Sequence, residues 1–201
     1  MKSKLQKIVG FAAFAFFVLG CSAINKIQKE VEKSQPPQIL NATDGSCQVS
    51  IPSTWRSETS LNEQAILQAS NRIGEQYIVI IRESKQDFGK NANLDFLTNL
   101  IQENLKEAVT SPVFSPTTAA TVNGFPSRQF EVGGEVLNYK IKYLYSVTET
   151  PQNFYQIITW TLASRFDSNR PQLLEVINSF KEISANPQTP FSSGNSSSKK
   201  P

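Results

Sequence analysis

Residues 139–163 read YKIKYLYSVTETPQNFYQIITWTLA. In the first half of this stretch, tyrosines and an isoleucine alternate with Lys140 and Lys142. Because successive side chains of a β-strand point to opposite faces, the alternation predicts a strand with one apolar and one polar face. Thr-Pro-Gln-Asn at 150–153 is typical of a turn, and the apolar run at 154–163 predicts a strand buried on both faces. The stretch therefore predicts two long antiparallel strands in a sheet that is covered on both sides.

The chain around this stretch supplies more strands and two helices. Gln76–Arg82 is apolar on both alternating faces and is expected to be another central strand. Gly133-Gly134 predicts a hairpin turn between two later strands. The predicted elements are strands around 49–55, 64–70, 76–82, 118–123, 127–132, 135–147 and 154–163, a helix over 94–108, and a last helix that starts at 167–169. This order predicts a mainly antiparallel sheet that carries helices on its faces.

Both predicted helices have a clear start and an apolar stripe. Asn93 is a typical N-cap for the first, and Pro112 prevents its extension. Pro171 is tolerated in the first turn of the second helix. Their predicted buried faces consist of Leu94, Leu97, Ile101, Leu105 and Ala108 in the first helix, and Leu173, Leu174, Ile177 and Phe180 in the second.

The N-terminus has the layout of an export signal. Three lysines in the first seven residues are followed by the apolar run Ile8–Leu19. As a helix, these 12 residues would span about 18 Å, whereas the hydrocarbon core of a bilayer measures about 30 Å. A basic segment followed by a short apolar one is typical of a signal peptide, here residues 1–20.

The end of the apolar run, Val18-Leu19-Gly20-Cys21, resembles the lipobox of bacterial lipoproteins. In that family the cysteine receives diacylglycerol, the signal is cut before it, and the new amino terminus is acylated. The resemblance implies that Cys21 is the lipidation site and the first mature residue. The alternatives are a cysteine that ends an ordinary cleavable signal, or a short anchor. Two or more acyl chains hold a protein firmly on a membrane, whereas one binds only marginally.

The positive net charge of the chain comes from the predicted signal peptide and does not indicate a binding partner. The full chain has a net charge of +3, but without residues 1–20 it has 17 basic and 17 acidic residues. A neutral mature chain argues against nucleic-acid binding.

Residues 21–38 are charged, poor in bulky apolar residues and closed by Pro36-Pro37, and we expect a flexible tether there. As coil, it would span roughly 25 Å. Residues 186–201 are rich in Ser, Pro and Asn and are expected to be disordered.

The composition offers little for catalysis. The sequence contains no histidine, which removes the most common general base and metal ligand. Cys47 has no base to activate it and is expected to be a small core residue. The acids Asp87, Glu131 and Glu135 show no metal-binding spacing, and solvated acids are the default interpretation, although a hairpin at Gly133-Gly134 would allow Glu131 and Glu135 to approach one another. We therefore expect no catalytic residues, no metal and no cofactor.

An aromatic band lies on the two long strands, and it has two interpretations. It consists of Tyr139, Tyr143, Tyr145, Phe154, Tyr155 and Trp160. Regular alternation favours core packing between sheet and helices. The second interpretation is a cleft at the strand ends, with Lys142 and Arg165 at its rim and Tyr143 inside, that binds a peptide, a small ligand or a partner surface.

Three features together resemble the PsbP/DcrB-like family. They are the opening Ile51-Pro52-Ser53-Thr54-Trp55, the long hairpin strands such as Tyr139–Val147, and a terminal helix containing Ser179-Phe180-Lys181. The resemblance covers about 145 of the 201 residues. It implies an α+β fold, an α/β/α sandwich with a mainly antiparallel sheet, over residues 39–185. The family includes a lumenal subunit of photosystem II and envelope lipoproteins, and most members are binding or assembly proteins. It shares no set of functional residues.

These observations predict a membrane-anchored extracytoplasmic lipoprotein that acts as a non-catalytic binding or assembly module. Its expected location is the periplasmic face of the inner or outer membrane, or the lumenal side of a thylakoid. Its expected partners are the membrane, through Cys21, and a protein whose identity the sequence does not give. The alternatives are an envelope enzyme that uses two carboxylates across a cleft, and a carrier of lipid or small solutes.

Overall fold

The computed structural model describes residue 30 and residues 34–89 and 92–183 of the 201-residue chain. The predicted signal peptide, Cys21, most of the predicted tether and the predicted C-terminal tail lie outside the described residues. Within the part that is described, no helix is both long enough and apolar enough to cross a membrane.

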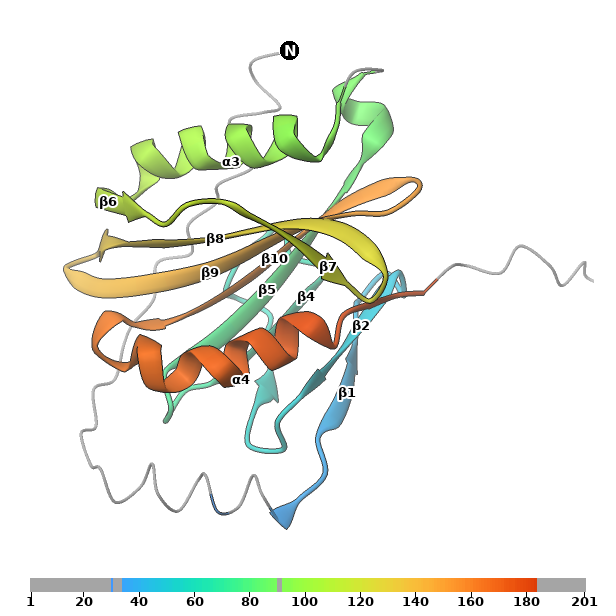
Figure 1. The fold of residues 1–201 in the computed structure, drawn as a ribbon. Coiled ribbons are helices and arrows are strands. Elements are labelled where there is room, and N and C mark those ends of the chain that lie inside the picture. The colour runs from blue at the N-terminus through green and yellow to red at the C-terminus, as the bar shows by residue number, and fades with distance from the viewer. Residues whose placement is uncertain (1–29, 31–33, 90–91, 184–201) are drawn as a thin grey trace, which may run out of the picture.

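The domain contains a large and a small antiparallel sheet (Figure 1). The large sheet has eight strands in the order β3-β4-β5-β10-β9-β8-β6, and β7 also pairs with β8. The small sheet has the order β1-β2-β11. The strands are β1 (Gln38–Asn41), β2 (Cys47–Ile51), β3 (Arg56–Ser57), β4 (Leu67–Asn71), β5 (Gln76–Ser84), β6 (Thr110–Phe114), β7 (Thr118–Val122), β8 (Phe125–Val136), β9 (Tyr139–Glu149), β10 (Asn153–Leu162) and β11 (Lys181–Glu182).

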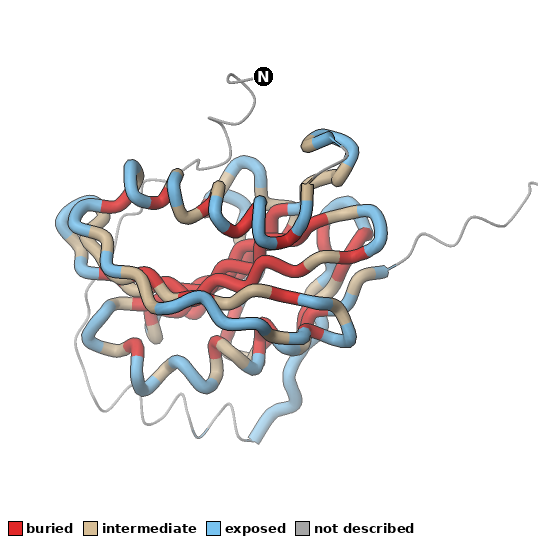
Figure 2. The backbone as a smooth tube through the Cα atoms, turned by 45° about the horizontal axis from the view of Figure 1, so that its top comes forward, coloured by how far each residue is buried: buried red, intermediate tan, exposed pale blue. Residues whose placement is uncertain are grey.

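Two helices lie on opposite faces of the large sheet, α3 (Leu94–Ala108) and α4 (Phe166–Asn178), as Figure 1 shows. Two short 3₁₀ helices, η1 (Lys85–Phe88) and η2 (Ala163–Arg165), follow β5 and β10. In Figure 2 the buried residues run along the strands in the middle of the molecule and recur at intervals along the helices. The predicted α+β architecture, a mainly antiparallel sheet covered by helices, is therefore confirmed.

The strand that is apolar on both faces, β10, lies near the middle of the sheet between β5 and β9. Trp160 on β10 pairs with Tyr77 on β5 and with Tyr143 on β9. Side chains on one face of these strands join the core under α3, and those on the other face join the core under α4. The two cores explain why β5 and β10 show no polar face in the sequence.

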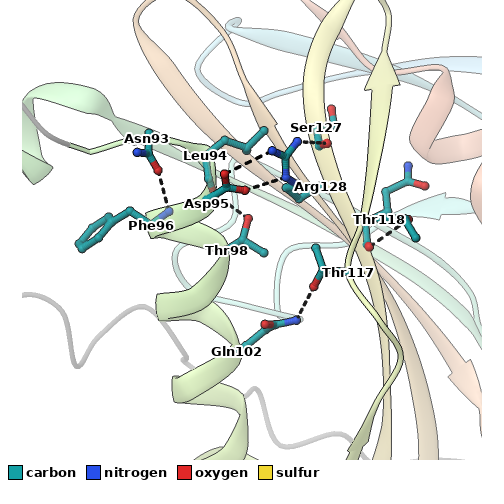
Figure 3. A network of polar contacts seen from close by, with 11 residues as sticks. Asn93, Leu94, Asp95, Phe96, Thr98, Gln102, Thr117, Thr118, Ser127 and Arg128 are labelled. Carbon is teal, nitrogen blue, oxygen red and sulfur yellow. Dashed lines mark hydrogen bonds and ion pairs between the residues drawn. The ribbon is translucent and has the colours of Figure 1, made fainter.

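The start of α3 is fixed by polar contacts to the sheet (Figure 3). The Asn93 side chain accepts a hydrogen bond from the backbone N–H of Phe96 at 2.8 Å, so the predicted N-cap is confirmed. Asp95 in the first turn pairs with Arg128 of β8, with 2.7 Å between the carboxylate and Nε. The apolar stripe predicted for this helix is buried at Leu94, Leu97, Ile101 and Leu105, and Ala108 is half-buried.

The end of α4 differs from the prediction. The helix ends at Asn178, so Ser179 and Phe180 lie beyond it, and Lys181 begins β11. The Ser179 Oγ accepts a hydrogen bond from the backbone N–H of Ser50 at 2.8 Å and donates to the carbonyl of Val176. Phe180 is fully buried. The sequence pattern placed Phe180 in the helix because Phe180 packs into the same core as α4, although it lies in the segment that follows the helix.

The hairpin predicted at Gly133-Gly134 is a second error. Both glycines lie within β8, and the turn to β9 is formed by Leu137 and Asn138, with φ of +51° and +67°. A Cβ added to Gly134 would lie 2.2 Å from Val109 Cγ1, so close packing and not a turn requires this glycine. Strands β1, β3, β6 and β11 were not predicted, because each is short and mostly exposed and shows little periodicity.

Candidate functional site

The structure does not gather the three predicted cleft residues in one place. Tyr143 is buried in the core under α3, whereas its neighbour Lys142 points to the α4 side of the same strand. Adjacent residues of a strand cannot share a face, so Lys142 and Tyr143 cannot line one cleft. Arg165 lies in η2, where its Nη1 is 3.2 Å from the buried carboxylate of Glu75. Burial raises the pKa of Glu75, and the charge of Arg165 opposes this effect.

Lys142 belongs to a charge cluster that joins α4 to the sheet. Glu131 of β8 lies 2.7 Å from Lys142 Nζ and 2.6 Å from Arg170 Nε of α4. The Lys142 ammonium also lies 4.2 Å from the centre of the Phe166 ring. Burial alone would raise the pKa of Glu131, but the hydrogen bonds and charges of Lys142 and Arg170 outweigh it and lower the pKa. The cluster has a structural role, since its charges are paired with one another.

Replacing Glu131 by glutamine is expected to lower the free energy of unfolding by about 1 kcal/mol at pH 7, because two cations lose their shared carboxylate. A carboxyl group whose folded pKa is lowered stabilises the protein above its unfolded pKa of about 4.3. That stability is lost as the pH falls through the lower folded value, so the difference between Glu131→Gln and wild type should shrink as the pH falls from 7 to 3.

Urea unfolding at pH 7 and pH 3 measures this difference. Glu135→Gln is the matched control, since Glu135 lies on the same strand and forms no ion pair with any described residue. A difference between wild type and Glu131→Gln that is equally large at both pH values would contradict the assignment.

The aromatic band packs as core, in two parts. Tyr77, Trp160 and Tyr143 form a continuous row across three strands under α3, with ring centres 5.2 and 5.8 Å apart. Tyr155 instead faces α4, where its ring centre lies 4.8 Å from that of Phe180. The core-packing interpretation therefore holds for this band, and the interpretation as a cleft is not supported.

The other candidate residues also have structural surroundings. Cys47 is fully buried in β2, and its burial, with Asp44 nearby, raises the pKa of the thiol to about 12. Glu131 and Glu135 lie on one strand and do not approach one another across a hairpin, which corrects that expectation. Asp87 lies in η1. Among the described residues, no group of three or more Cys, Asp or Glu side chains is arranged to hold a metal ion.

A polar pocket that the sequence did not reveal lies where several loops meet, at the end of the sheet where β9 turns into β10 (right in Figure 1). Its volume is about 320 Å³. The lining residues come from the β1–β2 loop, the end of β5, the β9–β10 turn and the segment around β11: Asp44, Gly45, Ser46, Arg82, Pro151, Gln152, Asn153, Tyr155, Glu182 and Ile183.

One wall of this pocket is the β1–β2 loop. Asp44 accepts hydrogen bonds from the backbone N–H and the hydroxyl of Ser46, at 3.0 and 2.6 Å. Gly45 has a φ of +71°, which a glycine adopts without strain. Arg82 lies 3.3 Å from the other oxygen of Asp44. Burial alone would raise the pKa of Asp44, but the Ser46 hydrogen bonds and the Arg82 charge outweigh it and lower the pKa.

The opposite wall is organised by Glu182 of β11. One of its carboxylate oxygens accepts hydrogen bonds from Thr150 Oγ1 at 2.9 Å, Tyr155 OH at 3.1 Å and Asn153 Nδ2 at 3.3 Å. The backbone N–H of Ile183 donates to the carbonyl of Ser46 at 2.7 Å and ties the two walls together. The pocket therefore has a fixed polar frame, with a partly exposed guanidinium and amide groups at its rim.

This frame is suited to hydrogen bonding and poorly suited to acid–base catalysis. Asp44 is held ionised by its donors, and Glu182 already accepts three hydrogen bonds at one oxygen. A general acid at neutral pH needs a raised pKa, which Asp44 lacks. The sequence could not reveal the pocket because its lining comes from four segments between residues 44 and 183, in turns and at strand ends, that are far apart along the chain.

Comparison with known proteins relates this geometry to a known fold. No family model and no curated protein matches the chain. Among solved structures, cyanobacterial PsbP (CyanoP) from Synechocystis sp. PCC 6803 matches 74% of this chain and 93% of its own, at 14% identity and a TM-score of 0.54.

Two further structures match at similar levels. LpqN from Mycobacterium tuberculosis, whose description says that it is involved in cell envelope biogenesis, matches 77% of this chain and 96% of its own, at 13% identity and a TM-score of 0.56. A protein from Bacteroides thetaiotaomicron VPI-5482 covers 78% of this chain and 52% of its own, at 11% identity and a TM-score of 0.52. Similarity at such low identity shows the fold alone. The chain therefore carries a domain with the PsbP-like α+β fold.

Proposed function

We propose that this protein is a lipid-anchored extracytoplasmic lipoprotein whose PsbP-like domain serves as a non-catalytic binding or assembly module. The lipobox-like Val18-Leu19-Gly20-Cys21 after a basic and apolar leader supports the anchor and the location. The fold shared with CyanoP and with the envelope-biogenesis protein LpqN supports the class of function.

The position of the polar pocket carries the proposal. The chain enters the domain at Gln38, which pairs with Ile51 at one end of the β1–β2 hairpin. Asp44 and Ser46, which form a wall of the pocket, lie in the loop at the opposite end of this hairpin. A domain held at the membrane through residues 21–37 therefore presents the pocket at the far end of this hairpin, where a soluble or membrane-bound protein has access to it.

The chemistry of the pocket favours a polar protein surface as the ligand. The Arg82 guanidinium, the amides of Gln152 and Asn153 and the carboxylate of Glu182 offer both donors and acceptors. Such a set fits backbone amides and polar side chains of a partner. The two carboxylates, Asp44 and Glu182, are each hydrogen-bonded within the frame, and this favours binding over the alternative of a carboxylate-dependent enzyme.

A photo-crosslinking amino acid at Gln152, on the exposed rim of the pocket, tests this function in membranes that contain the full-length protein. We expect one discrete protein adduct, and we expect Glu182→Ala to abolish it because Asn153 and Tyr155 lose their common acceptor. The same probe at Glu103, exposed on α3, is the control.

Equal crosslinking from Gln152 and Glu103, or an adduct that does not depend on Glu182, would contradict the pocket as binding site. The anchor is tested in the same cells: Cys21→Ser should move the protein out of the membrane fraction or leave it unprocessed. Mass spectrometry that finds an unmodified Cys21 in membrane-bound protein would contradict lipidation.

A further inference from the structure

Two hairpin turns extend the same end of the large sheet. The row Tyr77, Trp160, Tyr143 and Val132 runs across β5, β10, β9 and β8 by direct pairing. Ile73 lies in the β4–β5 turn, four residues before Tyr77, and Leu137 lies in the β8–β9 turn, five residues after Val132. Both turns therefore lie beyond the row at the same end of the strands. The β8–β9 turn and the start of α4 are seen at the left of Figure 1.

Both turns carry a large aliphatic side chain at an exposed tip. Ile73 is 56% exposed and Leu137 is 54% exposed. Leu137 adopts a φ of +51° and the following Asn138 a φ of +67°, a conformation that turns normally satisfy with Asn or Gly. An exposed leucine at such a position contributes nothing to the core and strains the backbone, so its presence points to a contact outside the domain.

In two ion pairs near these tips, the cation is more exposed than the carboxylate. Arg72, next to Ile73, is 57% exposed, while the Glu58 carboxylate that it contacts at 2.7 Å is 13% exposed. Arg165 is 25% exposed, and its partner Glu75 only 4%. In both pairs the carboxylate is covered, and the arginine is the more accessible partner. Lys140, beside the β8–β9 turn, is also exposed.

The chain enters the domain at this side. The Gln38 side chain donates a hydrogen bond to the carbonyl of Trp55 at 2.8 Å. The next residue, Arg56, pairs with Ser70 on β4, the strand that leads directly into the turn containing Ile73. The entry point of the tether and the Ile73 turn therefore lie along the same edge of the domain.

We propose that this end of the domain is a membrane-docking face for an anionic lipid bilayer. Ile73 and Leu137 insert into the interfacial region, and Arg72 and Lys140 contact lipid phosphates. The inference rests on the proposed lipid anchor, which holds this end close to the bilayer. Docking would orient the domain, so that the polar pocket points away from the membrane at a fixed angle.

Single-cysteine labelling of the lipidated full chain in vesicles tests the docking face. Ile73→Cys and Leu137→Cys are labelled with the environment-sensitive dye NBD, and Phe96→Cys is the matched control. Phe96 is 47% exposed and lies at the opposite end of the sheet, next to the Asp95–Arg128 pair. The native Cys47 does not interfere, because it is fully buried and its thiol has a pKa of about 12.

In vesicles of phosphatidylcholine with phosphatidylglycerol, we expect a blue-shifted emission and quenching by doxyl lipids at residues 73 and 137, and neither at 96. Introduced into the two labelled chains, Arg72→Gln with Lys140→Gln should reduce the blue shift at residues 73 and 137, and vesicles of pure phosphatidylcholine should reduce it as well. Ile73→Ser with Leu137→Ser, labelled at Lys140→Cys, should abolish the shift there.

The outcomes separate the two proposals. Water-like emission at residues 73 and 137 while the protein stays on the vesicles would overturn the docking face and leave the anchor intact. Reaction of the dye with Cys21 would contradict lipidation, and a blue shift at residues 73 and 137 in that protein would support docking without an anchor. A shift that requires added membrane proteins would overturn the bilayer as the partner.

Discussion

Phe180→Ala is expected to lower the free energy of unfolding by about 3–5 kcal/mol. The side chain is fully buried in the core under α4, and its ring centre lies 4.8 Å from that of Tyr155. Truncation leaves a cavity between α4, β2 and β10, because the surrounding backbone is held by paired strands. Equilibrium unfolding in urea measures the loss.

Phe96→Ala is the matched control for this prediction, since the Phe96 side chain is 47% exposed on α3. We expect it to change the stability by less than about 0.5 kcal/mol. If the alanine variant does not fold, Phe180→Leu takes its place in the test. Leucine fills most of the volume of the phenylalanine side chain, so this variant should lose less stability than Phe180→Ala. Equal unfolding midpoints for the two alanine variants would show that Phe180 is not part of the core.

Tyr155 packs against Phe180 and also donates a hydrogen bond to Glu182, so Phe180→Ala should loosen the polar pocket as well.

Gly134→Ala is expected to destabilise the domain by about 1–3 kcal/mol or more, although alanine is normally better tolerated in a strand than glycine. The added Cβ would lie 2.2 Å from Val109 Cγ1 and 2.9 Å from the backbone oxygen of Thr110. The second contact is to backbone, so it is relieved only if β6 moves away from β8. Thermal unfolding followed by circular dichroism measures the effect.

The neighbouring glycine supplies the control. A Cβ on Gly133 would meet its nearest atoms at 3.9 and 4.0 Å, which is ordinary contact, and neither glycine has a positive φ. Gly133→Ala should therefore leave the stability almost unchanged. Adding Val109→Ala to Gly134→Ala removes the shorter contact, so the double variant should lose less stability than the sum of the two single variants. Additive losses would show that the two residues do not clash.

The proposed docking face and the polar pocket lie at opposite ends of the large sheet, so docking would orient the domain on the membrane. The docking face, with Ile73 and Leu137, lies at the end of the large sheet where β10 finishes, and the polar pocket lies where β9 turns into β10. The strands between them are long and paired on both sides, so the domain is a rigid spacer. An anchored protein of this shape holds its pocket at a defined height above the bilayer, and this geometry suits an assembly factor.

Much of the fold was predictable from periodicity, and the errors have physical causes. The long strands were predicted from their apolar runs and alternation, and α3 was predicted from its apolar stripe and the Asn93 cap. The hairpin was misplaced at Gly133-Gly134 because the glycine signal for turns is indistinguishable from a glycine needed for close packing. Short edge strands such as β6 and β11 depend on partners distant in sequence, which no local pattern encodes.

The candidate site was the least predictable part. The aromatic band suggested a cleft around Tyr143 with Lys142 and Arg165 at its rim, but alternation places Tyr143 in one core and Lys142 on the other face of the sheet. The pocket of Asp44, Arg82 and Glu182 combines residues from three distant segments. None of them stands out in the sequence, because a polar residue in a turn is also what a solvated surface requires.

The sequence by itself determined the predicted export leader, the likeness of Val18–Cys21 to a lipobox and the alternation that makes residues 139–163 the centre of a sheet, since each depends on neighbours along the chain. Only the tertiary structure decided that Gly134 is a packing residue, that Phe180 closes a core from outside its helix, and that Ile73 and Leu137 extend the same end of the domain. Those properties come from strand register and long-range packing, which bring together residues that the chain keeps far apart.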